Sequence, residues 1–270
     1  MNVTIRPAES LHEVMAALRA YWTVGHPAAH DEAFARHWFM TPWVDIMKFP
    51  DKISVIVAER DGVLVGCDGV IITPVQAWRV IWSVAPSMRG MGLGMKLAES
   101  MNALLAPPIH VFGISDAGRP IYEKLGFQLR VALRWRLGHE PHIAKMRPDP
   151  ADDDWIGYRY DQHPSFRYER RGETIVRSDL NAWGRVLHVA RLGPDWPEAL
   201  RGEVYRYDLV QAWAYQSPGW GWEVPPTTVP TVFHPVEARG NTLLVAGLPA
   251  APRTIHGSDG GQDRPACVAA

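Results

Sequence analysis

One stretch of the sequence decides how this chain folds, Val84-Ala85-Pro86-Ser87-Met88-Arg89-Gly90-Met91-Gly92-Leu93-Gly94. It follows an apolar run typical of a strand, and it leads into a run with helical spacing. Its glycines let backbone N–H groups converge without obstruction by side chains, and the helix that follows adds its positively polarised N-terminus. The stretch therefore predicts a strand-to-helix turn that can hold a pyrophosphate.

The glycines alone do not identify the ligand, because dinucleotide-binding folds use the same device. In this chain the turn lies near residue 90, after several predicted strands, and not after the first strand of a β-α-β unit. No Gly-Lys-Ser or Gly-Lys-Thr follows it, which excludes a P-loop. An ordinary turn at the start of a helix remains the alternative.

The segments around this turn alternate between strand and helix patterns. Helical spacing of apolar residues predicts helices over residues 9–20, 31–39, 93–105 and 119–125. Alternating or continuous apolar runs predict strands over residues 3–6, 53–59, 63–72, 77–84, 109–114 and 127–137. The order β-α-α-β-β-β-α-β-α-β predicts an α+β fold with a mixed central sheet over residues 1–138.

The second half of the chain predicts a further, mostly β domain. Prolines and consecutive aspartates mark a linker over residues 139–154. Strand patterns follow over residues 166–170, 174–178, 185–190, 231–236 and 243–246, and a helix is expected over 196–213. We therefore expect a second domain over residues 155–248 and a C-terminal tail over residues 249–270.

The composition is that of a globular protein, with 47% hydrophobic and 21% charged residues. A net charge of −1 and the absence of a basic stripe make nucleic acid an unexpected partner. The two cysteines cannot build a disulfide framework, and no His, Asp or Glu set has metal-ligand spacing, so no metal is expected. No signal peptide or membrane-spanning run is recognisable, so the sequence predicts a cytoplasmic protein without membrane association.

Two motifs make the chain resemble the GNAT (Gcn5-related N-acetyltransferase) superfamily. Arg89-x-x-Gly92-x-Gly94 is similar to that family's acetyl-CoA signature, and the segment 122–127, Tyr-Glu-Lys-Leu-Gly-Phe, is similar to a later element of the same family. The resemblance implies that acetyl-CoA or another short acyl-CoA binds with its pantetheine arm along residues 82–84 and its pyrophosphate at the turn. The cofactor-binding residues that it implies are Trp82, Val84, Met88, Arg89, Gly90, Met91, Gly92, Leu93, Gly94 and Ser115.

The same resemblance places Tyr122 near the thioester sulfur, where a phenol can protonate the departing thiolate. Two positions depart from the family pattern. Ser115 stands where an asparagine is frequent, and the strand 77–84 lacks the glutamate that serves many members as general base. The base is therefore open: Asp68 and His110 are candidates in the first half, and His163, His188 and His234 in the second, with ordered water as the remaining alternative.

A second, weaker resemblance concerns the acceptor. The segment 155–164 is similar to a Trp-x-x-x-Arg-Tyr-x-x-His-Pro pattern, and 257–265 to an Asp-Gln-Asp-Arg-Pro tail, of two-domain sugar N-acyltransferases from surface-polysaccharide and nucleotide-sugar pathways. It implies a degenerate second GNAT-like domain and an acceptor that is the amine of a nucleotide-linked amino sugar. The alternatives are another small amine, a protein amino group, or a non-catalytic CoA-binding protein.

Overall fold

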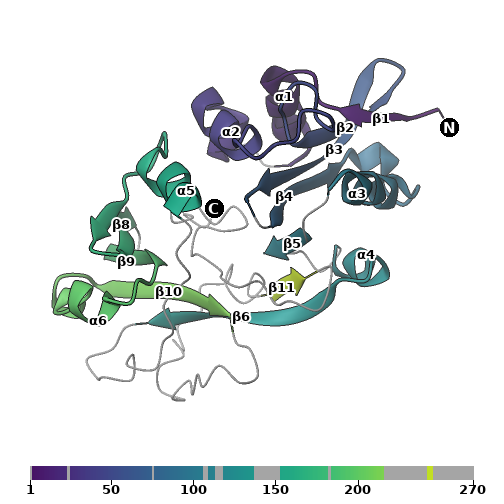
Figure 1. The fold of residues 1–270 in the computed structure, drawn as a ribbon. Coiled ribbons are helices and arrows are strands. Elements are labelled where there is room, and N and C mark those ends of the chain that lie inside the picture. The colour runs from purple at the N-terminus through teal and green to yellow at the C-terminus, as the bar shows by residue number, and fades with distance from the viewer. Residues whose placement is uncertain are drawn as a thin grey trace. The chain divides into compact units, whose positions relative to one another are not determined.

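The computed structural model describes residues 2–22, 25–74, 76–105, 109–112, 118–136, 153–181, 184–215 and 242–245. The chain divides into two compact units (Figure 1). The first unit comprises Met1–Val111 and Pro120–Phe127, and the second comprises Phe112–Arg119 and Gln128–Ala270. The chain therefore passes from one unit to the other three times, at residues 111/112, 119/120 and 127/128.

The first unit has the predicted order of elements up to the last strand, which belongs to the second unit. Its strands are β1 Thr4–Pro7, β2 Val55–Arg60, β3 Val63–Ile72, β4 Ala77–Val84 and β5 Ile109–Phe112. Its helices are α1 Leu11–Tyr21, α2 Glu32–Phe39, α3 Leu93–Leu104 and α4 Arg119–Lys124, with short 3-10 turns at η1 Pro27–Ala29 and η2 Pro86–Met88.

The sheet of the first unit runs in the order β1-β2-β3-β4-β5. Neighbouring strands are antiparallel except β4 and β5, which are parallel. The predicted α+β fold with a mixed sheet is thus confirmed. The β2–β3 hairpin turns at Asp61-Gly62, whose φ angles of 53° and 76° are the positive values that a two-residue turn of this kind requires.

The core of the first unit lies on both sides of β3. Residues 65–72 of this strand are all buried, and α1, α2 and α3 all contact it. The helices present apolar residues to the sheet, among them Val14, Leu18, Phe34, Trp38 and Leu97. The packing is set by the helical spacing of these residues, which gives each helix one apolar face.

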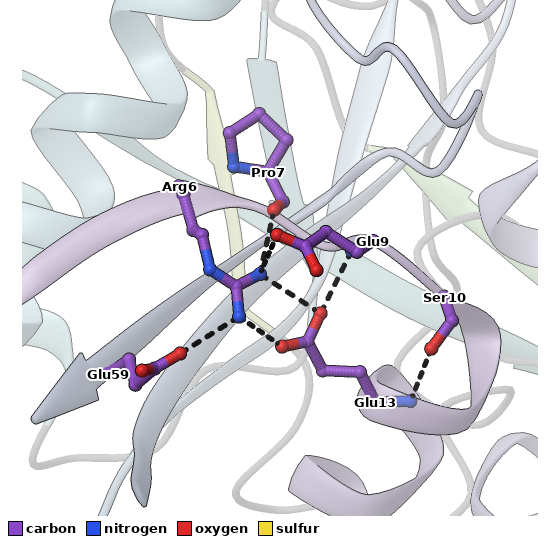
Figure 2. A network of polar contacts seen from close by, with 6 residues as sticks. All are labelled: Arg6, Pro7, Glu9, Ser10, Glu13 and Glu59. Carbon is purple, nitrogen blue, oxygen red and sulfur yellow. Dashed lines mark hydrogen bonds and ion pairs between the residues drawn. The ribbon is translucent and has the colours of Figure 1, made fainter. Parts of the chain in front are cut away.

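An arginine at the edge of the sheet ties β1, α1 and β2 together, as Figure 2 shows. Arg6 Nη2 lies 2.6 Å from Glu13 Oε1 and 2.9 Å from Glu59 Oε2, and its Nη1 lies 3.6 Å from Glu9 Oε1. Ser10 caps α1 by accepting a hydrogen bond from the N–H of Glu13. Hydrogen bonding to Glu13, partly opposed by burial and helped by Glu59, raises the pKa of Arg6 further above its usual range. We refer to these four charged side chains as the Arg6 network.

The second unit contains strands on either side of short helical segments. The strands are β6 Gln128–Arg136, β7 Glu169–Arg171, β8 Thr174–Asn181, β9 Gly184–Arg191, β10 Leu209–Tyr215 and β11 Thr242–Val245. They form the order β11-β6-β10-β9-β8-β7, in which β9 and β10 are parallel and the other neighbouring strands are antiparallel. The helical segments are α5 Asp153–Ile156, the π-helical turn η4 Gly157–Asp161, α6 Trp196–Ala199 and η5 Glu203–Tyr205.

One prediction for the second half is wrong. The expected helix over residues 196–213 ends at Ala199, and a strand occupies Leu209–Tyr215 instead. Gly202 interrupts the helical run with a φ of 75°, and β10 pairs with β9 on one side and β6 on the other. Pairing on both edges therefore outweighs the local helical pattern.

Several predictions fall outside the described residues. They are the strand over 231–236, His234, most of the linker 139–154 and the tail 249–270. The domain boundary at residue 138 stays a prediction, and the division above assigns β6 to the second unit. Among the helices of the described ranges, none combines the length and apolar character needed to cross a membrane.

Candidate functional site

The turn between β4 and α3 is built around two glycines with positive φ. Gly90 has a φ of 77° and Gly92 a φ of 80°, values that residues with a Cβ rarely adopt. A Cβ atom added at either position would meet nothing within 4 Å among the described residues, so the backbone faces open space there. The N-terminus of α3 follows directly, with Gly92 as its cap and no side-chain cap hydrogen bond. Its first N–H groups therefore lack an intrahelical acceptor and can bind an anion.

Two buried side chains and one hydrogen bond hold the turn in place. Met88 is 2% exposed and Leu93 is 4% exposed, whereas Arg89 and Met91 lie on the surface. Arg89 Nε donates a hydrogen bond of 3.2 Å to the carbonyl oxygen of Val84, which closes the turn back onto β4. Rigid anchoring below an open backbone is the arrangement that a preformed phosphate site needs.

Among the described residues, the outer edge of β4 is paired over part of its length. Its pairing with β5 covers Ala77 to Arg79, whereas its pairing with β3 continues to Val84. A register shift places Val80 as an extra residue opposite the step from Gly69 to Val70. A bulge bends a strand and disrupts its ladder, and the pairing between the described residues of β4 and β5 ends at Arg79, one residue before this bulge.

The indole of Trp82 connects this strand with the helix start. Its Nε1 donates a hydrogen bond of 3.1 Å to the carbonyl oxygen of Gly94. A Cβ atom at Gly94 would lie 3.0 Å from Cζ2 of the same ring, so only a very small residue fits there. The ring centroid of Trp82 also lies 5.2 Å from that of Tyr122, in an edge-to-face contact. The structure thus brings Trp82, Gly94 and Tyr122 into one cluster.

Tyr122 lies on α4, in the part of this helix that belongs to the first unit, and is 4% exposed. Its ring packs against Phe127 with centroids 5.1 Å apart, and the chain between them turns at Gly126, whose φ is 81°. Burial raises the pKa of Tyr122 above its usual range, and the nearby Arg79 charge acts in the opposite direction. The phenol is therefore protonated at neutral pH and can act as a proton donor.

Asp68 and Arg79 form an ion pair inside the first unit. Arg79 Nε lies 2.9 Å from Asp68 Oδ1, and the two side chains are 1% and 0% exposed. Arg79 Nη2 also donates to Asn102 Oδ1 at 2.9 Å and to the carbonyl oxygen of Ala98 at 3.3 Å. Burial raises the pKa of Asp68 to about 6, although Arg79 acts to lower it. We call Asp68, Arg79 and Asn102 the Arg79 network.

Arg79 and Asn102 were not among the residues predicted for the site. A signal was present, because an arginine and an aspartate each interrupt an otherwise apolar run, in β4 and in β3 respectively. Opposite charges within two buried strands indicate a pair, since an isolated buried charge costs far more than a paired one. Which residue on α3 completes the network depends on how the helix packs, and a sequence pattern does not give this.

The three histidine candidates in the described part of the chain are buried or hydrogen-bonded within their own units. His110 is 2% exposed, packs against Trp78 with ring centroids 5.2 Å apart, and has its pKa lowered to about 4 by burial, so it is neutral. His163 belongs to the second unit, where its Nδ1 accepts hydrogen bonds from the N–H groups of Ser165 at 3.2 Å and Phe166 at 3.0 Å. His188, also in the second unit, has Nε2 3.0 Å from Asp179 Oδ2. Ser115 lies outside the described residues.

The geometry fits a ligand with a phosphate group and an extended arm. Open glycines and the first N–H groups of α3 suit a pyrophosphate, and the later half of β4 suits an amide-containing chain that pairs like a strand. At the inner end lies a buried, protonated phenol beside Trp82. The sequence motifs predict acyl-CoA as the ligand of this turn, and its binding there stays a prediction.

Residues 51–129 match the family model described as acetyltransferase (GNAT) domain. Among solved structures, a GCN5-related N-acetyltransferase from Anabaena variabilis is similar, with a TM-score of 0.56 and 10% identity over 90% of this chain and 72% of that chain. This likeness shows the fold. The ribosomal-protein-S18-alanine N-acetyltransferase from Escherichia coli has a TM-score of 0.36 and 18% identity over 49% of this chain and 82% of that chain.

A search of curated proteins found no match. The GNAT family uses acetyl-CoA as its acyl donor, and the matched residues include the turn described above. Residues 51–129 of this chain therefore form a GNAT acetyltransferase domain, which indicates that the protein is an N-acetyltransferase.

Proposed function

We propose that this protein moves an acetyl or short acyl group from acyl-CoA to the amine of a nucleotide-linked amino sugar, and that the first unit holds the acyl-CoA. The observation that carries the donor assignment is the turn at Gly90 and Gly92. It offers open backbone at the uncapped start of α3. The part of β4 beyond its described pairing with β5 and the phenol of Tyr122 lie in the same unit.

Each part of this site has a task. The backbone N–H groups of residues 88–94 bind the pyrophosphate, and the exposed guanidinium of Arg89 contributes charge there. Trp82 and Val84 contribute backbone groups of β4 that pair with the pantetheine arm. Met88 and Leu93 keep the turn in place, because both are buried beneath it.

The transfer needs no covalent intermediate on the protein. The amine nitrogen attacks the thioester carbonyl carbon, a C–N bond forms, and the C–S bond breaks. Tyr122 gives its phenolic proton to the departing thiolate, and the proton that the amine releases through water restores the phenol. Asp68, which the sequence suggested as a base, is fully buried and accepts a hydrogen bond from Arg79, so we give it a supporting role.

The acceptor assignment rests on the pattern in residues 155–164, which lie within the second unit. In this segment Trp155, Arg159 and Tyr160 are buried, while Asp161 is exposed and pairs with Arg170 at 2.6 Å. The second unit also holds Arg177, His188 and Asp179 in one charged cluster, with Arg177 Nη2 2.8 Å from Asp179 Oδ2. Such side chains can bond sugar hydroxyls, and we propose this unit for acceptor recognition.

The donor assignment is tested by Gly92→Asp. The added carboxylate would occupy the place of the pyrophosphate and repel it, so the affinity for acetyl-CoA, measured by calorimetry, should fall by well over tenfold, or more than about 1.4 kcal/mol. Gly202→Asp is the matched control, because Gly202 also has a positive φ of 75° with nothing within 4 Å of an added Cβ. Unchanged binding in folded Gly92→Asp would reject the site.

The acceptor is tested by thiol release from acetyl-CoA with nucleotide-linked amino sugars, small amines and peptides. Acetylation of only the amino sugars supports the proposal. A small amine or peptide as sole acceptor replaces it, and no release despite CoA binding indicates a non-catalytic CoA-binding protein.

His163 is tested in the same assay. His163→Asn keeps an acceptor for the N–H groups of Ser165 and Phe166 and removes the imidazole, so His163→Ala and His163→Asn separate loop structure from acceptor recognition. Both variants should raise the acceptor KM and leave the affinity for acetyl-CoA within about threefold, since one neutral hydrogen bond is worth roughly 0.5–1.5 kcal/mol. Unchanged acceptor kinetics in His163→Ala would remove this residue from the acceptor site.

A further inference from the structure

The most unusual polar feature of the first unit is the buried guanidinium of Arg79. Its Cζ lies 5.8 Å from the ring centroid of Tyr122 and 5.9 Å from that of Phe127, both within the range of cation–π attraction. The side chain is 1% exposed. The positive charge therefore lies against the ring that the proposed reaction uses as its proton donor.

The guanidinium is held in one orientation by partners from two elements. Asp68 on β3 accepts from Nε, and Asn102 and the carbonyl oxygen of Ala98 on α3 accept from Nη2. Three acceptors fix a planar group far better than one, because rotation about any single bond would break the others. Among the described residues, Nη1 has no hydrogen-bond partner.

A buried phenol is a poor acid unless a positive charge is near. Loss of its proton leaves a negative oxygen that water cannot solvate, and burial accordingly raises the pKa of Tyr122. A fixed cation lowers this penalty, and its effect is stronger in a buried site than in water. For Tyr122, Arg79 acts in this direction more strongly than Asp68 acts against it.

We propose that Arg79 is a positioning residue of the transfer reaction, acting through Tyr122. It holds the phenol ring in place and stabilises the negative charge that develops on the phenolic oxygen as the proton passes to the thiolate. Asp68 and Asn102 in turn hold Arg79. This inference rests on the proposed function, because it assigns a role only if Tyr122 donates that proton.

A purely structural role would leave the pair hard to explain. Replacing a buried ion pair by apolar residues of similar size is often neutral or stabilising, so packing alone does not require charge in this strand. The other buried residues of β4 carry no charge: Trp78 and Ile81 are apolar, and Ser83 is neutral. The charged exception is the one whose side chain contacts Tyr122.

The test is a double-mutant cycle on the full-length protein with acetyl-CoA and the panel amine that the wild type acetylates fastest. Arg79→Met and Tyr122→Phe should each lower kcat about a hundredfold, the lower range for general acid catalysis, with the KM for acetyl-CoA within about threefold. Because Arg79 acts through Tyr122, the double variant should be no slower than Tyr122→Phe alone. Arg79→Lys should recover at least tenfold of the loss, since it keeps the charge.

Three results would overturn the proposal: wild-type turnover in Tyr122→Phe, losses that multiply in the double variant, or Arg79→Lys no faster than Arg79→Met. Should Arg79→Met fail to fold, the cycle is run with Asp68→Asn in every variant, which removes the uncompensated carboxylate.

Arg6→Met controls for lost stability, because it breaks a charge network of the same unit and should leave kcat unchanged. Failure of the proposed function looks different, since the wild type itself would then release no thiol with any amine.

Discussion

The Arg6 and Arg79 networks place the same side chain in two opposite environments of one unit. Arg6 is 26% exposed and is shared by Glu9, Glu13 and Glu59 at the edge of the sheet. Arg79 is 1% exposed and faces one carboxylate, that of Asp68, which is 0% exposed. The first network can lose a partner and use another, whereas in the second each partner is needed, because a buried charge without its counterion is very unfavourable.

The two networks also respond to pH with opposite sign. Burial acts to raise the pKa of Glu13, but hydrogen bonds from Arg6 and from the N–H of Glu9 lower it overall. Burial of Asp68 raises its pKa to about 6 despite Arg79. The edge network therefore favours the ionised carboxylate in the folded state, and the buried network favours the protonated one. Both networks pair arginine with carboxylates, so the degree of burial decides how each one contributes to stability at a given pH.

The largest effect is expected for Arg79→Met. It leaves Asp68 buried without its counterion, and loss of one partner of a buried pair typically costs about 3–5 kcal/mol. Denaturant unfolding followed by circular dichroism gives the change in the free energy of unfolding. Adding Asp68→Asn should recover a substantial part of it, and no recovery would contradict the view that the unpaired charge is the cause.

The second prediction uses the pH difference between the networks. A carboxyl with a raised pKa stabilises the folded state below its unfolded value of 3.8, and that contribution is lost as the pH rises through about 6. The stability of the wild type relative to Asp68→Asn should therefore fall between about pH 4 and pH 6. For Glu13 the sign is reversed. The stability of the wild type relative to Glu13→Gln should rise as the pH increases toward the usual pKa of 4.5, because the folded state holds this carboxyl ionised. If stability changed with pH in the same direction in both comparisons, the two networks would not differ in their response to pH.

A smaller effect is expected for Arg6→Met. Partly exposed ion pairs contribute roughly 0.2–1 kcal/mol each, so the loss should be about 1–2 kcal/mol for the network and should shrink in high salt. Measuring the free energy of unfolding at low and at high salt checks both statements. A loss as large as that of Arg79→Met, unaffected by salt, would show that exposure does not set the difference.

The smallest effect belongs to Arg36→Met. Arg36 pairs with Glu32 at 2.9 Å across one helical turn, but both side chains are more than half exposed, at 55% and 53%. Such pairs contribute at most about 0.5 kcal/mol. Thermal unfolding should place this variant close to the wild type, and a clear drop in its melting temperature would show that exposure is a poor guide in this unit.

Sequence reasoning succeeded where local chemistry decides the structure. Gly90 and Gly92 could be placed in a turn because glycine readily adopts positive φ, and the apolar run of β3 could be read as a buried strand. It failed where register and packing decide. The pairing of Asp68 with Arg79 depends on the bulge at Val80 in β4, and the strand Leu209–Tyr215 depends on neighbours far away in sequence.

The interleaving of the two units bears on how the protein is made. A ribosome that has released only residues 1–111 has released neither Tyr122 nor Phe127, which the first unit takes from a later stretch of chain. Because nascent chains fold largely unit by unit, the first unit cannot close around its phenol until residue 127 has emerged. A fragment that stops before Tyr122 would carry the proposed phosphate-binding turn without the proposed proton donor, and one that stops before Phe127 would lack part of the packing around that phenol. Synthesis therefore completes the proposed acyl-CoA turn before the proposed acid.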